Sequence, residues 1–356
     1  MDIKEILKEK APLINKTIEK WIAKNYDKTS ARFLLGEPRF EYDTDAMNNS
    51  LSEPIWFALE SGGKRWRPSL FLMICEALSK NLDDFLDFSI IPEIIHNGTL
   101  VVDDIEDNSE TRRGIDCVYK KYGIDIAINS GNAMYYLPFL VLLKNKKRFS
   151  DSVLLKAYEL YIQEMINLSV GQGTDIFWHG GKRNADKISE KQYLQMCLFK
   201  TGTLARFSAK LAAILCEADD MIMDKVGKFA ETAGVAFQIQ DDILDITAED
   251  REKFGKTYGN DIKEGKKTLM VLYVMSVGSE EDKKRLNEIL NLHTNKTELF
   301  DEAIAILKKY KTIEYAQDFA EKLVKEAWAE LDSVLKPSPA KEKLKAFADY
   351  LIKGDV

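Results

Sequence analysis

The 356-residue sequence has little of what several common kinds of functional site require. It contains four cysteines, none of them in a Cys-x-x-Cys pair, so neither a zinc site nor a disulfide framework is indicated. Such sparse and scattered cysteines are typical of the reducing cytosol. The four are Cys75, Cys117, Cys197 and Cys216. We therefore predict a cytoplasmic protein.

Long apolar runs and an excess of positive charge are also missing. The longest apolar stretch, residues 133–143, is too short to span a bilayer and contains Pro138. The first residues lack the basic segment followed by an apolar one that marks a secretory signal. The formal net charge of −7 argues against a nucleic-acid partner. These absences predict a soluble protein with no transmembrane segment and no nucleic acid as a partner.

Helical periodicity is what the sequence has in abundance. Apolar residues recur every three to four positions, and no strand-like alternation persists. The N-terminal pattern is interrupted at Pro12, and residues 28–45 are predicted to form a loop. The longer patterns predict helices at 52–60, 68–80, 86–107, 124–145, 150–172, 189–217, 221–246, 266–277, 280–291, 298–309, 313–334 and 340–353.

About a dozen such helices predict an all-α bundle around a central cavity, as one domain over residues 1–356. Within it we expect N-terminal helices and a loop in residues 1–50. A catalytic core would follow in residues 51–275, and C-terminal helices in residues 276–356.

Two acidic clusters of the same D-D-x-x-D design interrupt this pattern. They are Asp103, Asp104 and Asp107, and Asp241, Asp242 and Asp245. On a helix, positions three or four apart share a face, so each cluster crowds carboxylates that repel one another. One such cluster in an acidic protein is more often a solvated helix face. Two clusters preceded by apolar residues predict burial, and buried carboxylates need partners. Mg²⁺ suits this role, because it takes one or two protein carboxylates and then substrate phosphates.

Basic residues in the same regions suit a diphosphate. Residues 62–68, Gly-Gly-Lys-Arg-Trp-Arg-Pro, place three cations beside glycines that allow close approach of the backbone. Arg113 follows the first acidic cluster, Lys200 follows a helical run, and Lys256 and Lys266 follow the second cluster. Arginine suits bidentate contact with phosphate, whereas lysine acts as a mobile point charge.

Some of these residues have a simpler interpretation. Taken singly, Lys200 and Lys256 are as expected for surface lysines. His96 lies two helical turns before Asp103, where a packed core histidine and a substrate contact are equally compatible with the pattern. A P-loop over residues 250–257 is excluded, because Asp250 stands where the motif requires glycine.

In combination and order, these motifs resemble the trans-isoprenyl diphosphate synthases, or polyprenyl synthetases, and among them the geranylgeranyl diphosphate synthases. The resemblance covers about residues 50–350 and depends on residues 62–68, 93–96, 103–114, 171–175, 200–202, 237–245 and 265–269. It implies the all-α isoprenoid synthase fold, a homodimer, and three Mg²⁺ per active site with Mn²⁺ as an alternative.

The resemblance also implies a role for each matching residue. The six aspartates would ligate Mg²⁺, directly or through water, on the allylic diphosphate. The same diphosphate would be contacted by Arg112, Lys200, Lys256 and Lys266. Isopentenyl diphosphate would be held by Lys64, Arg67, His96 and Arg113. The reacting centre would be lined by Gln172, Thr201, Phe237 and Gln238.

Product length is predicted from the path of the growing tail along the helix before Asp103. The tail would pass Ile95, Gly98 and Thr99. Gly98 and Thr99 leave no bulky floor there, and each helical turn adds about 5.4 Å, close to one isoprene unit. The resemblance implies a floor at the length of geranylgeranyl diphosphate, with candidates Tyr135, Tyr136, Ser169 and Val170. The alternative is that both tyrosines only pack the core.

We therefore predict an enzyme that ionises an allylic diphosphate with the help of Mg²⁺ and condenses it with isopentenyl diphosphate. Its allylic substrates would be dimethylallyl, geranyl and farnesyl diphosphate. The alternatives are a farnesyl or longer-chain (C25 or above) diphosphate synthase, a class I terpene cyclase and a silent regulatory subunit. Cyclases usually lack an isopentenyl diphosphate pocket, whereas this sequence has the basic residues for one. Silent subunits usually lose an aspartate cluster, whereas this sequence has both clusters.

Overall fold

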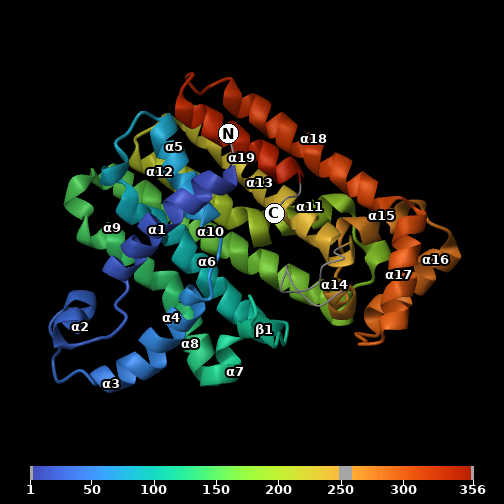
Figure 1. Ribbon diagram of the computed structural model, residues 1–356, viewed down its shortest axis with the longest axis horizontal. Helices are drawn as coiled ribbons and strands as arrows, with labels where there is room; N and C mark the ends of the chain where they lie inside the picture. The colour runs from blue at the N-terminus through green and yellow to red at the C-terminus, as the bar shows by residue number, and fades with distance from the viewer. Residues whose placement is uncertain (1–2, 248–258, 354–356) are drawn as a thin grey trace. The chain divides into compact units, whose positions relative to one another are not determined.

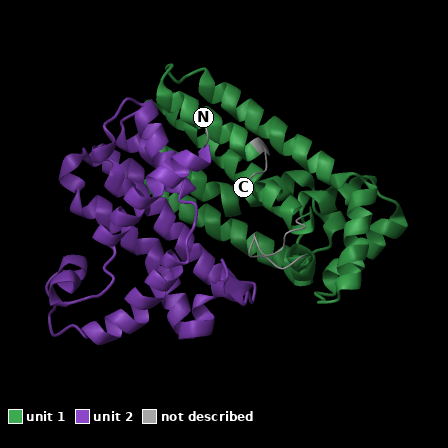
Figure 2. Ribbon diagram, in the orientation of Figure 1, with its two compact units in different colours: residues 1, 159–210, 219–356 green, residues 2–158, 211–218 purple. Residues whose placement is uncertain are grey.

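The computed structural model describes residues 3–247 and 259–353, with side chains as far as Leu351. Residue contacts divide the chain into two compact units (Figure 2). Unit 1 comprises residues 159–210 and 219–356 with residue 1, and unit 2 comprises residues 2–158 and 211–218. Helices form most of the described chain, whose one sheet has two short strands (Figure 1). The all-α prediction is confirmed, and the single domain stays a prediction.

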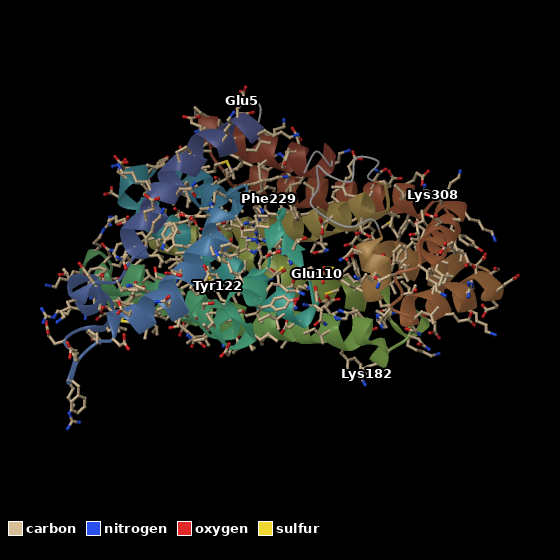
Figure 3. The ribbon with its side chains drawn as sticks, turned by 60° about the horizontal axis from the view of Figure 1, so that its bottom comes forward. Glu5, Glu110, Tyr122, Lys182, Phe229 and Lys308 are labelled. Atoms are coloured by element: carbon tan, nitrogen blue, oxygen red, sulfur yellow. The ribbon has the colours of Figure 1, made fainter. Side chains whose placement is uncertain are left out.

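Unit 2 is built around α6 (Leu86–Glu106), which packs against α1, α5 and α8. Phe88, Ile91 and Ile95 of α6 are fully buried and form part of the core. The ring of Tyr122, a residue labelled in Figure 3, meets that of Phe57 edge-on, with 5.7 Å between the ring centres. The other helices are α1 (Ile3–Trp21), α2 (Lys28–Leu35), α3 (Thr44–Met47), α4 (Glu53–Glu60), α5 (Trp66–Ala77), α7 (Val118–Tyr122), α8 (Ile124–Tyr136) and α9 (Leu140–Lys144). Strands β1 (Thr111–Arg112) and β2 (Ile115–Asp116) pair antiparallel, with Arg112 opposite Ile115.

Helices α6 and α8 approach each other closely because both carry glycine at the contact. A methyl group added to Gly98 would lie 2.7 Å from Cβ of Met134 and 2.8 Å from the carbonyl oxygen of Gly131. A methyl group added to Gly131 would lie 2.9 Å from Val102. Because no larger residue fits at this spacing, the two glycines bring Tyr135 to within contact of α6, ahead of the first acidic cluster.

Unit 1 is built around α13 (Asp220–Thr247), which packs against α18 (Thr312–Asp332). Phe229 of α13 is fully buried, and its ring meets that of Trp328 edge-on at 5.7 Å (Figure 3). Two further helices are divided between the units: α10 (Asp151–Phe177) belongs to unit 1 from residue 159, and α12 (Thr203–Leu215) belongs to it up to residue 210. The other helices of unit 1 are α11 (Glu190–Cys197), α14 (Asn260–Glu264), α15 (Leu269–Val277), α16 (Glu280–Asn291), α17 (Thr297–Lys309) and α19 (Pro339–Lys353).

Two N-terminal predictions are wrong. Helix α1 continues through Pro12, because buried residues on both sides of the proline, such as Ile6 and Ile14, keep its apolar face against the core. Residues 28–35 form α2 instead of a loop. Asp27 begins this helix with a capping box, since its carboxylate accepts a hydrogen bond from the Ser30 backbone N–H at 2.7 Å.

Two predicted long helices are subdivided. Residues 124–145 form α8 and α9, separated at Leu137–Phe139 by a 3₁₀ turn (η3) that contains Pro138, because proline cannot donate the next helical hydrogen bond. Residues 189–217 form α11 and α12, separated by a π-helical turn, η7 (Leu198–Gly202). Two further turns are π-helical, η1 (Asn48–Ser52) and η5 (Trp178–Lys182). Three are 3₁₀ turns, η2 (Leu82–Asp84), η4 (Lys146–Arg148) and η6 (Ala185–Lys187).

In the described part of the chain, one stretch, Ile124–Lys144, is long and apolar enough to cross a membrane by length and composition. Of its most apolar window, 44% is buried inside the protein. Core helices of proteins that never enter a bilayer pass the same test, so one stretch of this kind is weak evidence of a span. The predicted lack of a transmembrane segment stays a prediction.

Candidate active site

The first acidic cluster lies at the C-terminal end of α6. Asp104 is 3% exposed, whereas Asp103 and Asp107 are half-buried. Arg112 donates from Nε to Oδ1 of Asp104 at 2.8 Å and from Nη2 to Oδ2 of Asp103 at 3.5 Å. Burial raises the pKa of Asp104 against the opposing effect of Arg112. A helix C-terminus already carries partial negative charge, so these carboxylates favour further positive charge.

Several cations of unit 2 gather near His96. Arg67 is 6% exposed, and its guanidinium lies 4.3 Å from the ring centre of Trp66. Burial lowers the pKa of Arg67 to about 10, with Glu93 opposing this effect and Arg113 adding to it. Burial and the charges of Arg67 and Arg113 also hold the pKa of His96 well below its usual range. His96 is therefore a neutral imidazole among guanidinium groups, an arrangement that an anion would stabilise.

The double glycine allows Arg113 to lie against the chain. Gly62 and Gly63 have φ angles of 104° and 128°, which residues other than glycine rarely adopt. A methyl group on Gly63 would lie 3.1 Å from a terminal nitrogen of Arg113. Arg113 also donates to the Ser61 hydroxyl at 3.2 Å and to the Gly62 carbonyl.

The three cations of residues 62–68 have different environments. Arg65 is buried and donates to Glu93 at 2.8 Å and to the Leu59 carbonyl at 2.8 Å, so it holds α4, α5 and α6 together. Lys64 is exposed, and Arg67 belongs to the cation group near His96.

A pocket in unit 2 brings the acidic and basic groups together. Its volume is about 310 Å³, including space open to solvent. Polar lining comes from Asp104, Arg112 and Arg113, and apolar lining from residues such as Phe57 and Leu100. This wall combines charges that bind an anion with carbon surface that excludes water.

The second acidic cluster lies on α13. Asp241 is half-buried, whereas Asp242 and Asp245 are 4% and 6% exposed. Oδ2 of Asp245 accepts the backbone N–H of Asp261 at 3.1 Å. Burial, Asp261 and Asp241 raise the pKa of Asp242 to about 8, although Gln238 and Lys266 oppose the shift. Carboxylates crowded in this way favour a bound cation.

Lysines of unit 1 accompany this cluster. Lys266 Nζ lies 3.1 Å from Oδ1 of Asp261 and 2.7 Å from Oε2 of Glu264. Lys200 Nζ lies 2.6 Å from Oδ2 of the buried Asp175. Burial tends to raise the pKa of Asp175, but Lys200 and neighbouring cations hold that pKa well below its usual range.

The turn that carries Lys200 and Thr201, η7, is fixed by glycine contacts. A methyl group on Gly171 would lie 2.3 Å from the backbone nitrogen of Lys200, and one on Gly234 would lie 2.7 Å from Cα of Gly202. The turn therefore packs directly against α10 and α13, which determines where its side chains begin.

Within residues 3–247 and 259–353, no three carboxylate, imidazole or thiol groups already converge as ligands of one ion. Mg²⁺ does not require such a cage, because substrate phosphates and water complete its coordination. The residues fit a divalent ion on a separate observation. Among the described residues, buried Oδ2 of Asp261 has no hydrogen-bond partner, and the charge of Asp261 acts on the carboxyl of Asp242.

The structure places the predicted residues in both units. Unit 2 holds Lys64, Arg67, Ile95, His96, Gly98, Thr99, Asp103, Asp104, Asp107, Arg112, Arg113, Tyr135 and Tyr136. Unit 1 holds Ser169, Val170, Gln172, Lys200, Thr201, Phe237, Gln238, Asp241, Asp242, Asp245 and Lys266. Lys256 lies outside the described residues. The roles assigned to these residues stay predictions.

Sequence reasoning missed two residues of unit 1, Asp261 and Tyr193. Asp261 follows Asp245 by 16 residues, a separation with no helical regularity. Tyr193 is one of 14 tyrosines and sits in an ordinary amphipathic helix. Only the D-I-K sequence before Gly265-Lys266 could have drawn attention to Asp261, and nothing in the sequence distinguished Tyr193.

Comparison with known proteins agrees with the motifs. Residues 48–307 match the family model described as polyprenyl synthetase. A geranylgeranyl diphosphate synthase of Sulfolobus acidocaldarius is 33% identical over 305 residues, 85% of this chain and 90% of that protein. A geranylgeranyl pyrophosphate synthase of Geoglobus acetivorans is 32% identical over 99% of each chain. The solved geranylgeranyl pyrophosphate synthetase of Pyrococcus horikoshii Ot3 has a TM-score of 0.83 at 29% identity, covering 99% of this chain and 98% of that one. The chain belongs to the polyprenyl synthetase family.

Proposed function

We propose that this protein is a Mg²⁺-dependent trans-prenyltransferase that condenses isopentenyl diphosphate with allylic diphosphates, and that its main product is geranylgeranyl diphosphate. The observation that carries the proposal is the crowding of like charges in each unit. Asp261 and Asp241 each repel Asp242 in unit 1, and Arg113 repels Arg67 in unit 2. Divalent cations and diphosphate anions together would neutralise both groups.

The protein's own residues have distinct tasks in this reaction. Bound Mg²⁺ would stabilise the negative charge that develops on the departing diphosphate. Arg112, Lys200 and Lys266 would bind diphosphate oxygens. Arg67 and Arg113 would hold isopentenyl diphosphate, with neutral His96 adding a hydrogen bond but no charge.

The proposed chemistry requires no nucleophile from the protein. The double bond of isopentenyl diphosphate attacks the allylic carbocation, and the released diphosphate accepts the proton that is then lost. The apolar wall formed by residues such as Phe57 and Leu100 would keep water from the carbocation.

Tyr135 is the preferred floor for the growing tail. Its ring lies 3.3 Å from where a methyl group on Gly98 would stand. Burial raises the pKa of Tyr135, with additional effects of Glu106 and Asp103, so the ring lies near the first acidic cluster with its hydroxyl neutral. Tyr136 is 67% exposed. We therefore assign the floor to Tyr135, at the level of Gly98, with Thr99 on the path before it.

A homodimer, three Mg²⁺ per site and a cytoplasmic location complete the proposal. Ile162, Ile166, Val170 and Phe177 of α10 are exposed by 57%, 54%, 50% and 50%. Their spacing puts them along one side of the helix. An apolar stripe of this kind suits contact with a second copy of the chain, and mass measurement in solution would test it.

A product-length assay tests the function. Purified protein would be incubated with isopentenyl diphosphate and each allylic primer, with Mg²⁺ or with a chelator. We expect twenty-carbon product only with metal. Failure to elongate any primer, or elongation that survives chelation, would contradict the proposal.

The same assay tests the floor. Tyr135→Ala should lengthen the products, whereas Tyr136→Ala, its neighbour on α8, should not. Unchanged chain length in Tyr135→Ala would discard this floor.

A further inference from the structure

Four side chains of unit 1 form a continuous hydrogen-bond chain. The Tyr193 hydroxyl lies 3.0 Å from Oδ2 of Asp242. Gln238 donates from Nε2 to Oδ1 of Asp242 at 2.8 Å, and the Thr201 hydroxyl donates to Oε1 of Gln238 at 2.9 Å. The hydrogen bonds join α11 and the turn η7 that directly follows it to α13, which is distant in sequence. It ends at a residue predicted to line the reacting centre.

Both oxygens of Asp242 are engaged by protein donors. Its side chain is 4% exposed, whereas the preceding Asp241 is half-buried. A buried carboxylate that accepts a hydrogen bond on each oxygen is fixed in its orientation. The less covered Asp241 is better suited to ligate metal directly.

Tyr193 is built to hold its position. It is 2% exposed and among the largest fully buried side chains. Its helix, α11, begins with a capping box in which Ser189 and Gln192 exchange hydrogen bonds at 3.0 and 3.3 Å. Its hydroxyl is placed to donate to Oδ2 of Asp242 at 3.0 Å. A buried tyrosine hydroxyl needs a polar partner, and Asp242 supplies it.

Thr201, at the other end of the hydrogen-bond chain, is restrained through both its backbone and its side chain. Gly171 and Gly234 seat the backbone of η7, and Gln238 fixes the direction of the Thr201 hydroxyl. Gln238 itself is oriented by Asp242. Loss of the Tyr193 hydroxyl would release Asp242, then the Gln238 amide, and finally the Thr201 hydroxyl.

We propose that Tyr193 is a positioning residue, which fixes Asp242 and through Gln238 orients Thr201, and that Asp242 anchors this chain without ligating Mg²⁺ directly. The inference rests on the proposed function, because Thr201 and Gln238 are assigned to the reacting centre there. It refines the sequence-based prediction, which gave all six aspartates the same role.

Tyr193→Phe tests the hydroxyl alone, because the ring and its packing are kept. Tyr315→Phe is the matched control. It removes a hydroxyl that donates at 2.5 Å to Glu190. Glu190 lies on the same helix, α11, but takes no part in the hydrogen-bond chain from Tyr193 to Thr201. We expect Tyr193→Phe to lower kcat by roughly tenfold or more, because Gln238 and Thr201 lose their fixed orientation. KM for isopentenyl diphosphate and the Tm should match those of Tyr315→Phe.

A second pair of variants separates anchoring from metal ligation. Asp241→Asn should raise the Mg²⁺ concentration needed for half-maximal rate severalfold, whereas Asp242→Asn should lower kcat without that rise. Equal rises in both variants, or a Tyr193→Phe enzyme as active as Tyr315→Phe, would overturn the inference. Loss of kcat in step with Tm would also overturn it, because a purely structural role explains that result. An inactive wild-type protein would instead refute the proposed function.

Discussion

The two acidic clusters share a sequence pattern, but their middle aspartates have chemically different partners. Asp104 accepts hydrogen bonds from the Arg112 guanidinium, eight residues further on. Asp242 accepts them from a tyrosine hydroxyl and an amide, which are both neutral. Burial raises the pKa of both carboxyls, and that of Asp242 reaches about 8 because Asp261 and Asp241 add to the effect.

This difference shows that the D-D-x-x-D pattern does not determine how its charge is balanced. The first cluster includes a counter-charge in the same short segment, so Asp104 forms an ion pair without any ligand. The middle aspartate of the second cluster is oriented by neutral donors, and Lys266 opposes its repulsion from Asp261 and Asp241 in part, so bound cations would relieve that repulsion further. We therefore expect substitutions at the first cluster's arginine to affect stability, and those at the second cluster's neutral donors to affect turnover.

The largest expected effect comes from the first aspartate of each cluster, Asp103 and Asp241, which are both half-buried. Asp103→Ala or Asp241→Ala should lower turnover by roughly a thousandfold or more, because electrostatic stabilisation of the leaving diphosphate is lost. Far-UV circular dichroism should be unchanged. Initial rates at saturating substrate and Mg²⁺ measure the effect, and a near-normal rate in either variant would remove that cluster from the mechanism.

Arg112→Leu tests the ionic half of the comparison. The substitution leaves Asp104, 3% exposed, as a buried carboxylate without its ion-pair partner. The free energy of unfolding should fall by about 3 kcal/mol, against about 1 kcal/mol for Tyr193→Phe, which removes a neutral donor. Denaturant titration measures both values.

Asp104→Leu/Arg112→Leu is the control for that prediction. It removes both charges and should recover part of the lost stability, because no unpaired charge stays buried. If the single and double variants were equally unstable, packing and not charge would explain the loss.

Both acidic helices also carry a glycine contact before the cluster, at Gly98 and Gly234. A methyl group on Gly234 would push η7 away from α13, so Gly234→Ala should lower kcat roughly 10- to 100-fold through displaced Lys200 and Thr201. Gly98→Ala should instead change the product lengths, since it disturbs Tyr135. Gly180→Ala, where no atom lies within 4 Å of the added methyl group, is the control. The same change in both acidic-helix variants would contradict separate roles.

Much of the fold and part of the site could be predicted from sequence. The helical repeat of apolar residues located most helices, because the apolar face of a helix depends only on residues close together in the sequence. Partners across the fold could not be predicted. Arg65 and Arg67 lie two residues apart, yet one forms a buried ion pair with Glu93 and the other joins the cation group. Tyr193 and Asp242 are 49 residues apart, and no local pattern signals their contact.

Lys267 extends the comparison to a buried cation. It is 3% exposed, and among the described residues its Nζ has no hydrogen-bond partner. Burial lowers its pKa from 10.5 to about 8. The unfolded chain therefore takes up a proton as pH falls through 10.5, whereas the folded protein does so only near pH 8. This difference destabilises the fold progressively between these values and fully below pH 8.

Lys267→Met should therefore stabilise the protein at pH 7, by on the order of 2–3 kcal/mol, and by much less at pH 10. Denaturant midpoints at the two pH values measure the gain, with Lys263→Met, an exposed lysine of α14, as the control without a pH-dependent gain. A gain of the same size at both pH values would mean that packing, not the buried charge, limits stability there. A loss at pH 7 would show that the Lys267 ammonium has a partner and that this part of unit 1, like the first acidic cluster, balances its buried charge by pairing.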